Sequence, residues 1–328
     1  MSTPALTIGV DLGGSQLRAA LVDHTGRVLR FHARRTPVER GPDGIVDELA
    51  ACVRDACLAG AGAAVLGVGV GVAGQVNRAG VVQGAPNLAW SQFPLRARLE
   101  TALDLPVTVL NDVQAAAVGE HAFGAGQDVD DLVCLFIGTG VGGGVITRGA
   151  LLQGCTGSAA ELGHITVDRD GPVCRCGNRG CLEAFTGGWA IAFRAREALT
   201  ATPTNGAVLL ELAGSPDRVT AATVVKAADL GDPLSRQIIR HAGEALGIGT
   251  ASIVNAFNPC LVVLGGGVMA GMPKWIDLAG EAVRSRALAA NAAAVRLRPA
   301  ALGPRAGVIG AAAWAASTLG EPHEQSST

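Results

Sequence analysis

Three cysteines and a histidine in the middle of the chain have the types and spacing of a tetrahedral metal site. Cys174, Cys176 and Cys181 fall within eight residues of polar sequence, and His164 precedes them in the segment ELGH. One imidazole and three thiolates form a complete ligand set for Zn²⁺, and four protein ligands leave no open coordination position. The sequence therefore predicts a structural zinc ion, the alternative being a chance grouping of core cysteines.

The other five cysteines are spread through apolar or glycine-containing segments. We expect them to be small buried thiols rather than partners in disulfides. They are Cys52, Cys57, Cys134, Cys155 and Cys260.

A first glycine turn, in the segment DLGGSQLR, has the composition of a phosphate-binding loop. Gly13 and Gly14 would let the backbone approach a phosphate, and the hydroxyl of Ser15 would donate to its oxygens. Asp11, at the end of an apolar run, could help to hold Mg²⁺ through water. An ordinary hairpin turn explains this motif equally well.

A second glycine turn, in the segment GTGVGGG, has the same composition. It contains Gly138, Thr139 and Gly140 and continues to Gly144, with five glycines in seven residues. So many glycines would weaken a purely structural pair of strands, which favours close approach of a phosphate to the backbone. Neither turn is a Walker loop or a GxGxxG motif, so a P-loop or Rossmann site is not expected.

Two pairs of polar residues complete the candidate site. Asn111 and Asp112 follow the apolar run VTVL and precede an Ala-rich segment, at the end of a strand where open α/β sheets bind ligands. Asp112 could equally serve only to cap the following helix. Glu161 and Glu183 flank the metal cluster, and paired carboxylates suit a ligand rich in hydroxyl groups.

The elements that must position these residues alternate between strands and helices. An apolar run, a glycine turn and a second apolar run occur at residues 6–21 and again at 132–151, which predicts two related halves. The pattern indicates an α/β fold that becomes strongly helical after residue 184. Further strands are expected at 64–74, 105–112, 260–268 and 294–298, and helices at 44–60, 113–123, 187–199, 221–230, 232–257 and 305–318.

Composition excludes several classes of protein. The chain has 328 residues, 49% of them hydrophobic, which is enough for two lobes, and its formal charge of −2 provides no basic field for nucleic acid. It has no basic, signal-like start and no apolar run of the roughly 18 residues that would span a bilayer. We expect a cytoplasmic protein with no nucleic-acid or membrane partner.

Seven segments in this order resemble the ROK family of sugar kinases and repressors: DLGGSQLR, GVAGQV, APNLAW, LND, GTGVGGG, ELGH and CRCGNRGCLE. The resemblance covers most of the chain. It implies a two-lobe actin/hexokinase-like ATPase fold with duplicated, ribonuclease H-like lobes. The expected N-terminal lobe is 1–118, with the helix at 305–318 packing back on it, and the C-terminal lobe is 119–304, with a zinc loop at 164–181. Residues 319–328 are expected to form a disordered tail.

The resemblance also implies roles for individual residues. Asp112 would be the catalytic base, and ATP would be used with Mg²⁺. The contacts to sugar hydroxyls would be Asn87, Asn111, Glu161, His164 and Glu183, with His164 also joining the zinc site. Gly138 to Gly140 would hold the ATP phosphates, and Gly265, Gly266 and Gly267 would lie against the adenosine.

The sequence departs from the family pattern near the candidate base and in two turns. Ser15 replaces the usual Thr, Ala73 stands where Pro is common, and Val113-Gln114 replaces the frequent Ala-Asn. No required chemical group is lost. The change at Gln114 lies close to the base and leaves sugar specificity open.

These features together predict phosphorylation of a hexose at its primary (6-) hydroxyl, with glucose as the expected substrate. N-acetylglucosamine, N-acetylmannosamine, mannose, fructose and allose kinases share nearly every motif. The rivals from other classes are a sugar-sensing ROK regulator and an actin-like structural protein. A regulator would carry an extra N-terminal helix-turn-helix domain, for which the first hairpin, beginning by residue 6, leaves no room. Family members are commonly dimers or tetramers, so we expect a homodimer or homotetramer.

Overall fold

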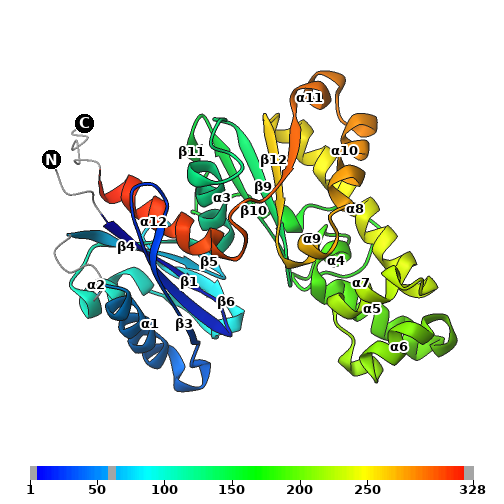
Figure 1. Cartoon of the computed structure of the whole chain (residues 1–328), viewed down its shortest axis with the longest axis horizontal. Coiled ribbons are helices and arrows are strands. Elements are labelled where there is room, and N and C mark those ends of the chain that lie inside the picture. Colours follow the sequence, from blue (N-terminus) through cyan, green and yellow to red (C-terminus); the bar gives the residue numbers. More distant parts are fainter. Residues whose placement is uncertain (1–5, 58–63, 321–328) are drawn as a thin grey trace. The chain divides into compact units, whose positions relative to one another are not determined.

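The computed structural model of the chain describes residues 6–57 and 64–320, which fall into two compact units (Figure 1). The first unit contains the described residues up to 128 together with 144–160 and 301–320. The second unit contains 129–143 and 161–300. The tail expected at 319–328 lies outside the described residues from 321 onward.

The first unit is built on a five-stranded sheet in the order β3-β2-β1-β4-β8. Strands β1, β2 and β3 are antiparallel neighbours, and β4 and β8 continue the sheet parallel to β1. The central strands β1 and β4 are buried along most of their length, as their apolar sequences require. The strands are β1 (Leu6–Leu12), β2 (Gln16–Val22), β3 (Val28–Arg35), β4 (Val65–Val72) and β8 (Val107–Asn111).

The first unit also contains four helices and a small sheet. The helices are α1 (Gly41–Cys57), α2 (Leu95–Leu103), α3 (Asp112–Phe123) and α12 (Ala306–Leu319). The small antiparallel sheet is formed by β5 (Gln75–Val76), β6 (Val82–Ala85) and β7 (Trp90–Phe93). The predicted helix at 44–60 is confirmed as far as residue 57, and its remaining residues lie outside the described part of the chain.

The second sheet repeats the strand order of the first. Its order is β11-β10-β9-β12-β13. When the strands of each sheet are numbered from 1 to 5 along the chain, both sheets have the order 3-2-1-4-5. Strand β12 pairs in parallel with β9 and with β13. This repetition confirms the predicted duplication. The strands are β9 (Leu132–Ile137), β10 (Val141–Thr147), β11 (Ala150–Leu151), β12 (Leu261–Gly265) and β13 (Arg296–Pro299).

Outside strands β9, β12 and β13, helices dominate the second unit, as predicted for the chain after residue 184. The predicted strand at 260–268 is too long, because Gly266 has a φ of 95° and Gly267 begins a helix. The helices are α4 (Glu183–Thr186), α5 (Gly188–Ala201), α6 (Ala207–Ala213), α7 (Ala221–Asp229), α8 (Pro233–Phe257), α9 (Gly267–Gly271), α10 (Trp275–Arg286) and α11 (Ala289–Ala294).

Helix α12 brings the C-terminal part of the chain into the first unit. It packs against β1, β4 and α3, beside the blue strands of the first unit in Figure 1. Gly310 lies so close to α3 that a Cβ atom there would overlap the carbonyl oxygen of Ala115. A Cβ on Gly69 of β4 would likewise overlap the carbonyl of Ala311. Glycine is therefore required where the helix backbone meets its neighbours.

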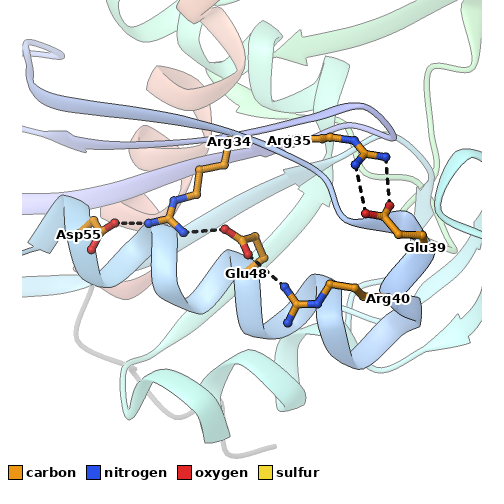
Figure 2. Close-up of polar contacts among 6 residues, drawn as sticks. All are labelled: Arg34, Arg35, Glu39, Arg40, Glu48 and Asp55. Atoms are coloured by element: carbon orange, nitrogen blue, oxygen red, sulfur yellow. Dashed lines mark hydrogen bonds and ion pairs between the residues drawn. The ribbon is translucent and has the colours of Figure 1, made fainter.

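Ion pairs join the edge strand β3 to helix α1 (Figure 2). Arg34 of β3 donates to Glu48, at 2.6 Å, and to Asp55, both on α1. Arg40, which precedes α1, also pairs with Glu48, at 3.3 Å. Because these side chains are partly exposed, each pair is expected to contribute about 1 kcal/mol or less. The network fixes how α1 lies along the edge strand more than it stabilises the fold.

Burial of the cysteines differs in part from the prediction. Cys52 and Cys134 are buried, but Cys155 and Cys260 are exposed. Both exposed residues lie in short connections, where an apolar flanking sequence does not ensure burial. Among residues 6–57 and 64–320, no helix is both long and apolar enough to cross a membrane.

Candidate functional site

The hairpin of β1 and β2 forms a polar cavity in the first unit. The cavity has a volume of about 430 Å³ and is lined by Asp11, Gly13, Ser15, Gln16 and Arg18. Arg18 lies directly opposite Asp11 in the strand register and donates to its Oδ2 at 3.0 Å. The second terminal nitrogen of Arg18 donates to Gln16 at 2.7 Å.

Burial raises the pKa of the Asp11 carboxyl, and Arg18 only partly offsets this effect.

Three of the residues that line the cavity, Asp11, Gly13 and Ser15, were predicted to bind phosphate or Mg²⁺. Gln16 and Arg18 were not, although the two-residue period of β2 places them on one face of the strand. Their arrangement gives the cavity one cation beside one carboxylate.

The first glycine turn touches a residue predicted to bind the sugar. A Cβ atom on Gly14 would lie 2.7 Å from the Cβ of Asn87 and 2.9 Å from its carbonyl oxygen. Asn87 lies in a short 3-10 turn, Pro86–Leu88, that is followed by Ala89 in the left-handed conformation, with φ 54°. Only glycine allows this approach, so the hairpin and the APNLAW turn are held together.

Asn111 and Asp112 lie at the carboxyl edge of the first sheet. Leu12 of β1 pairs with Val72 of β4, and Val72 pairs with Asn111 of β8, so the ends of the three parallel strands are neighbours. Ligands of α/β sheets bind at this kind of edge. The prediction that Asp112 follows a buried strand at such an edge is confirmed.

The capping role belongs to Asn111 and not to Asp112. The side-chain oxygen of Asn111 accepts hydrogen bonds from the N–H groups of Val113, at 2.8 Å, and Gln114, at 3.1 Å. Its side-chain nitrogen donates to the carbonyl of Gly74 at 3.1 Å. Asp112 is the first residue of α3, and its Oδ1 accepts from Val113 at 3.0 Å, which orients the carboxylate. The alternative that Asp112 serves only as the helix cap is therefore wrong.

In the second unit the other glycine turn touches another predicted sugar residue. The turn is closed by a hydrogen bond from the Gly138 N–H to the Gly140 carbonyl, 2.9 Å long. A Cβ atom on Gly140 would lie 2.5 Å from Oε2 of Glu183. That oxygen accepts from the N–H of Val141 at 2.8 Å, and Oε1 accepts from the indole of Trp189 at 3.1 Å. Glu183 is thus held rigidly beside the turn.

The four predicted zinc ligands are brought together. Their ligand atoms all lie within 4.8 Å of one another. His164 Nδ1 is 3.7 Å from Cys174 Sγ, and Cys176 Sγ is 3.7 Å from Cys181 Sγ. A tetrahedral zinc ion at ordinary bond lengths would separate two sulfur ligands by about 3.8 Å, and a nitrogen and a sulfur ligand by about 3.6 Å. The spacing of the donors therefore fits zinc.

The cluster also influences its carboxylate neighbours and its own thiols. Sγ of Cys174 lies 4.0 Å from Oε1 of Glu183. Burial raises the pKa of the Cys174 thiol and raises that of Cys181 to about 12. Burial is also the main reason why the pKa of Glu161 is raised, with His164 lowering it and Glu183 raising it further.

The three glycines expected at the adenosine follow β12. A Cβ on Gly265 would meet the ring of Phe136 at 2.7 Å, and Gly266 requires its positive φ, so packing and backbone conformation account for these two. Gly267, the first residue of α9, has open space where a Cβ would lie. Of the three, Gly267 is the one whose lack of a side chain leaves room for a ligand.

Comparison with known proteins agrees with these features. The chain is 38% identical to a glucokinase of Streptomyces coelicolor over 94% of its own length and 96% of that protein. The crystal structure of a ROK family glucokinase from Streptomyces griseus, in complex with glucose and AMPPNP, is 39% identical. It matches with a TM-score of 0.81, covering 95% of this chain and all of that one. A xylose repressor of Caldicellulosiruptor bescii is 30% identical over 95% of this chain and 78% of its own length.

These matches confirm the predicted fold class, the actin/hexokinase-like ATPase fold with duplicated ribonuclease H-like halves. The model of the ROK family matches residues 7–318. The chain belongs to the ROK family.

Proposed function

We propose that the protein is an ATP-dependent hexokinase that phosphorylates glucose at its primary hydroxyl, giving glucose 6-phosphate and ADP. The observation that carries the proposal is the 39% identity, over 95% of the chain, to a kinase whose structure holds glucose and an ATP analogue. Further support comes from Asp11 and Arg18 in the polar cavity and from the hydrogen bonds that orient Asp112 and Glu183.

Asp112 is the proposed general base. Its carboxylate accepts the proton of the primary hydroxyl while the hydroxyl oxygen attacks the γ-phosphorus, and the bond from the γ-phosphorus to the bridging oxygen of ADP breaks. Because the side chain of Asn111 caps the N-terminus of α3, the Asp112 carboxylate is not required as the helix cap. The N–H of Val113 holds one carboxylate oxygen and thereby fixes the direction of the other.

The remaining candidate residues bind and orient the two substrates. Contacts to sugar hydroxyls are assigned to Asn87, Asn111, Glu161, His164 and Glu183. The side-chain oxygen of Asn111 already accepts two hydrogen bonds, so its amide nitrogen, with a second hydrogen, is the group that can donate to a sugar. The turn at Gly13–Ser15, the turn at Gly138–Gly140 and Arg18 are assigned to phosphate oxygens, and Gly267 to the nucleoside.

Two metal ions complete the proposal. Mg²⁺ prefers oxygen ligands and retains water, and the Asp11 carboxylate in its polar cavity suits such an ion. When bound, Mg²⁺ neutralises phosphate charge. Zn²⁺ would be held by His164, Cys174, Cys176 and Cys181, and its task would be to fix the loop that contains His164 and adjoins Glu183.

The proposal is tested by measuring ADP release from Mg-ATP with a panel of hexoses. Glucose should give the highest kcat/KM, and Asp112→Asn should lower kcat by about 10²–10⁴-fold, the usual contribution of a general base, while glucose binding is retained. Asp47→Asn, an exposed residue of α1, is the control and should behave as wild type.

Other outcomes of these measurements would change the proposal in different ways. Preference for an acetamido sugar, mannose, fructose or allose would change the substrate and retain the mechanism. Sugar binding without ADP release would favour a regulator, the class of the 30% identical xylose repressor. An Asp112→Asn variant with near-normal turnover would remove Asp112 from the mechanism.

A further inference from the structure

A buried glutamine on α3 binds a loop that lies directly before Glu161 in the sequence. Gln114 is 3% exposed, and its amide nitrogen donates to the carbonyls of Gly157 and Ala159, both at 3.2 Å. An amide nitrogen has two hydrogens, so both donors of Gln114 are used on this loop. The contact joins residues more than forty positions apart within the first unit.

The loop, residues 153–160, is compact and is anchored a second time. It is closed by the Ala159 N–H, which donates to the Gln153 carbonyl at 3.1 Å. Arg78 donates to the Gly154 carbonyl at 2.6 Å. Gly157 has a φ of 92°, and a Cβ there would lie 2.6 Å from the carbonyl of Val76. The tip, Cys155 and Thr156, is exposed, whereas the base of the loop lies on α3 and the β5–β6 turn.

Gln114 itself does not share the face of α3 that presents Asp112. Residues two apart on a helix point to different sides. Asp112 is half-buried, and Gln114 is fully enclosed with its amide committed to the loop. Gln114 therefore has no donor left for a substrate and can act only through the loop it holds.

We propose that Gln114 is a positioning residue that sets sugar affinity by fixing the loop at 153–160 against the first turn of α3. The inference rests on the proposed hexokinase function. The anchored Ala159 stands two residues before Glu161, which is assigned to sugar hydroxyls, so a fixed Ala159 limits the backbone positions open to Glu161. The base, Asp112, is oriented separately by Val113.

Because Gln114 holds the loop and Val113 orients the base, substitution of Gln114 should affect sugar binding and not the chemical step. Gln114→Leu keeps the approximate volume and removes both donors, so the buried Gly157 carbonyl and the half-buried Ala159 carbonyl lose their hydrogen bonds to the side chain. Glucose KM should rise about 10–100-fold, whereas kcat and the KM for ATP should change by less than about 3-fold, the pattern of lost ground-state binding. Gln114→Asn retains the amide on a shorter side chain and should recover part of the affinity.

The second readout is hydrogen exchange in the loop. The Ala159 N–H should exchange faster in Gln114→Leu than in wild type, with the rest of the first unit unchanged. Thr250→Val is the matched control, because Thr250 is also fully buried and donates to a backbone carbonyl, Leu246, at 2.8 Å. It removes one buried donor from α8 and should alter neither the loop nor the glucose KM.

The two measurements separate the possible failures. Unchanged loop exchange in Gln114→Leu, or faster exchange with wild-type kinetics, overturns the inference. So does an equal rise of glucose KM in Thr250→Val, which would indicate a general effect of lost stability. A wild-type protein that neither binds nor phosphorylates any hexose overturns the proposed function, and the inference with it.

Discussion

Two neighbouring residues at the start of α3 have different tasks. The sequence leaves open whether Asp112 is a functional carboxylate at the sheet edge or only the cap of the following helix, and it does not point to Asn111 as the cap. The backbone decides: Asn111 has φ −65° and ψ 148°, the extended conformation of a cap, and Asp112 is already helical. Composition alone does not reveal this difference, because Asn and Asp are about equally good caps.

Packing within the protein explains some of the glycines in the segment 138–144. The composition of this segment predicts a large ligand close to the backbone. The structure gives Gly140 a protein neighbour, Glu183, and places the Cβ of Ala117 2.4 Å from a Cβ on Gly144. Gly138 alone of these three has open space. Such packing between distant residues is not visible in a local motif.

The carboxyl of Asp11 predicts an unusual dependence of stability on pH. Its pKa is raised in the folded protein, mainly by burial, so the native state takes up this proton more readily than the unfolded state. Its contribution to stability is therefore present at acid pH and is lost as pH rises through the folded pKa. Asp11→Asn should raise Tm relative to wild type at pH 7–8, and the gain should vanish towards pH 4, while kinase activity falls.

Asp23 is a useful control because its pKa is shifted in the opposite direction to that of Asp11. Burial acts to raise its pKa, but hydrogen bonds from Thr25 and Arg27 outweigh that effect and lower it. Asp23→Asn should therefore lower Tm at neutral pH, and the loss should disappear as pH falls through the folded pKa. Thermal unfolding of the three proteins from about pH 2 to pH 8 checks both signs, because the lowered pKa of Asp23 places its change below about pH 4. Parallel curves for the two variants would contradict the assignment.

The predicted metal loop, 164–181, contains little regular secondary structure. Between the short 3-10 turn Leu162–His164 and α4 it forms only two isolated β-bridges, Thr166 with Cys181 and Val173 with Arg179. Turn hydrogen bonds, such as those from Val167 to Gly180 and from Cys174 to Asn178, both 2.8 Å long, shape the loop, and a metal held by the four ligands would tie these turns together. Metal and loop are therefore expected to be coupled, as in other small zinc sites.

Two exposed cysteines offer a matched test of that coupling. Cys176→Ser removes a predicted ligand, and Cys155→Ser removes a thiol outside the cluster. Wild type and Cys155→Ser should bind about one zinc ion per chain, whereas Cys176→Ser should bind little and should show a glucose KM raised by about 10–100-fold, because Glu183 and His164 lose their support. Metal analysis by mass spectrometry and sugar kinetics provide the readouts. A metal-free wild type with full activity would contradict the zinc assignment.

Strand β3 and helix α2 were not predicted from the sequence, because neither has a strong pattern of buried apolar residues. Strand β3 is an edge strand whose side chains are mostly exposed, so it lacks a buried apolar face. Helix α2 is short, with only Leu95 and Leu99 buried. By contrast, β1, β4, β9 and β12 are apolar along most of their length, and these were all predicted.

At the scale of the whole molecule, the repeated hairpin was enough to predict a duplicated fold. The family resemblance implies that the helix at 305–318 packs back on the N-terminal lobe, but nothing in the sequence groups residues 144–160 with that lobe. Residues 144–160 and 301–320 belong to the first unit, although residues of the second unit lie between them in the chain. The Gln114 contacts with Gly157 and Ala159 are one example of the long-range pairs that produce this grouping.

The close approach of α12 to α3 should make the first unit sensitive to a single methyl group. Gly310→Ala places a Cβ against the backbone of Ala115, which neither side can easily relieve, so we expect a loss of at least about 1–3 kcal/mol in the free energy of unfolding. Gly84→Ala in β6 is the control, because no atom lies within 4 Å of its Cβ position. Urea denaturation curves of both variants measure the difference, and equal stability would show that the helix can shift.

The position of α12 in the sequence also has a consequence for synthesis. A ribosome delivers β1, β4 and α3 first, but their partner α12 follows only after the whole second unit. At roughly 5–20 residues per second, the nascent first unit would wait roughly 10–40 s with Ala20 and Val22, which pack on Val308 and Ile309 in the finished protein, uncovered. During that interval the growing chain presents an apolar sheet face to its surroundings, which makes it a natural client for chaperones that bind emerging polypeptides.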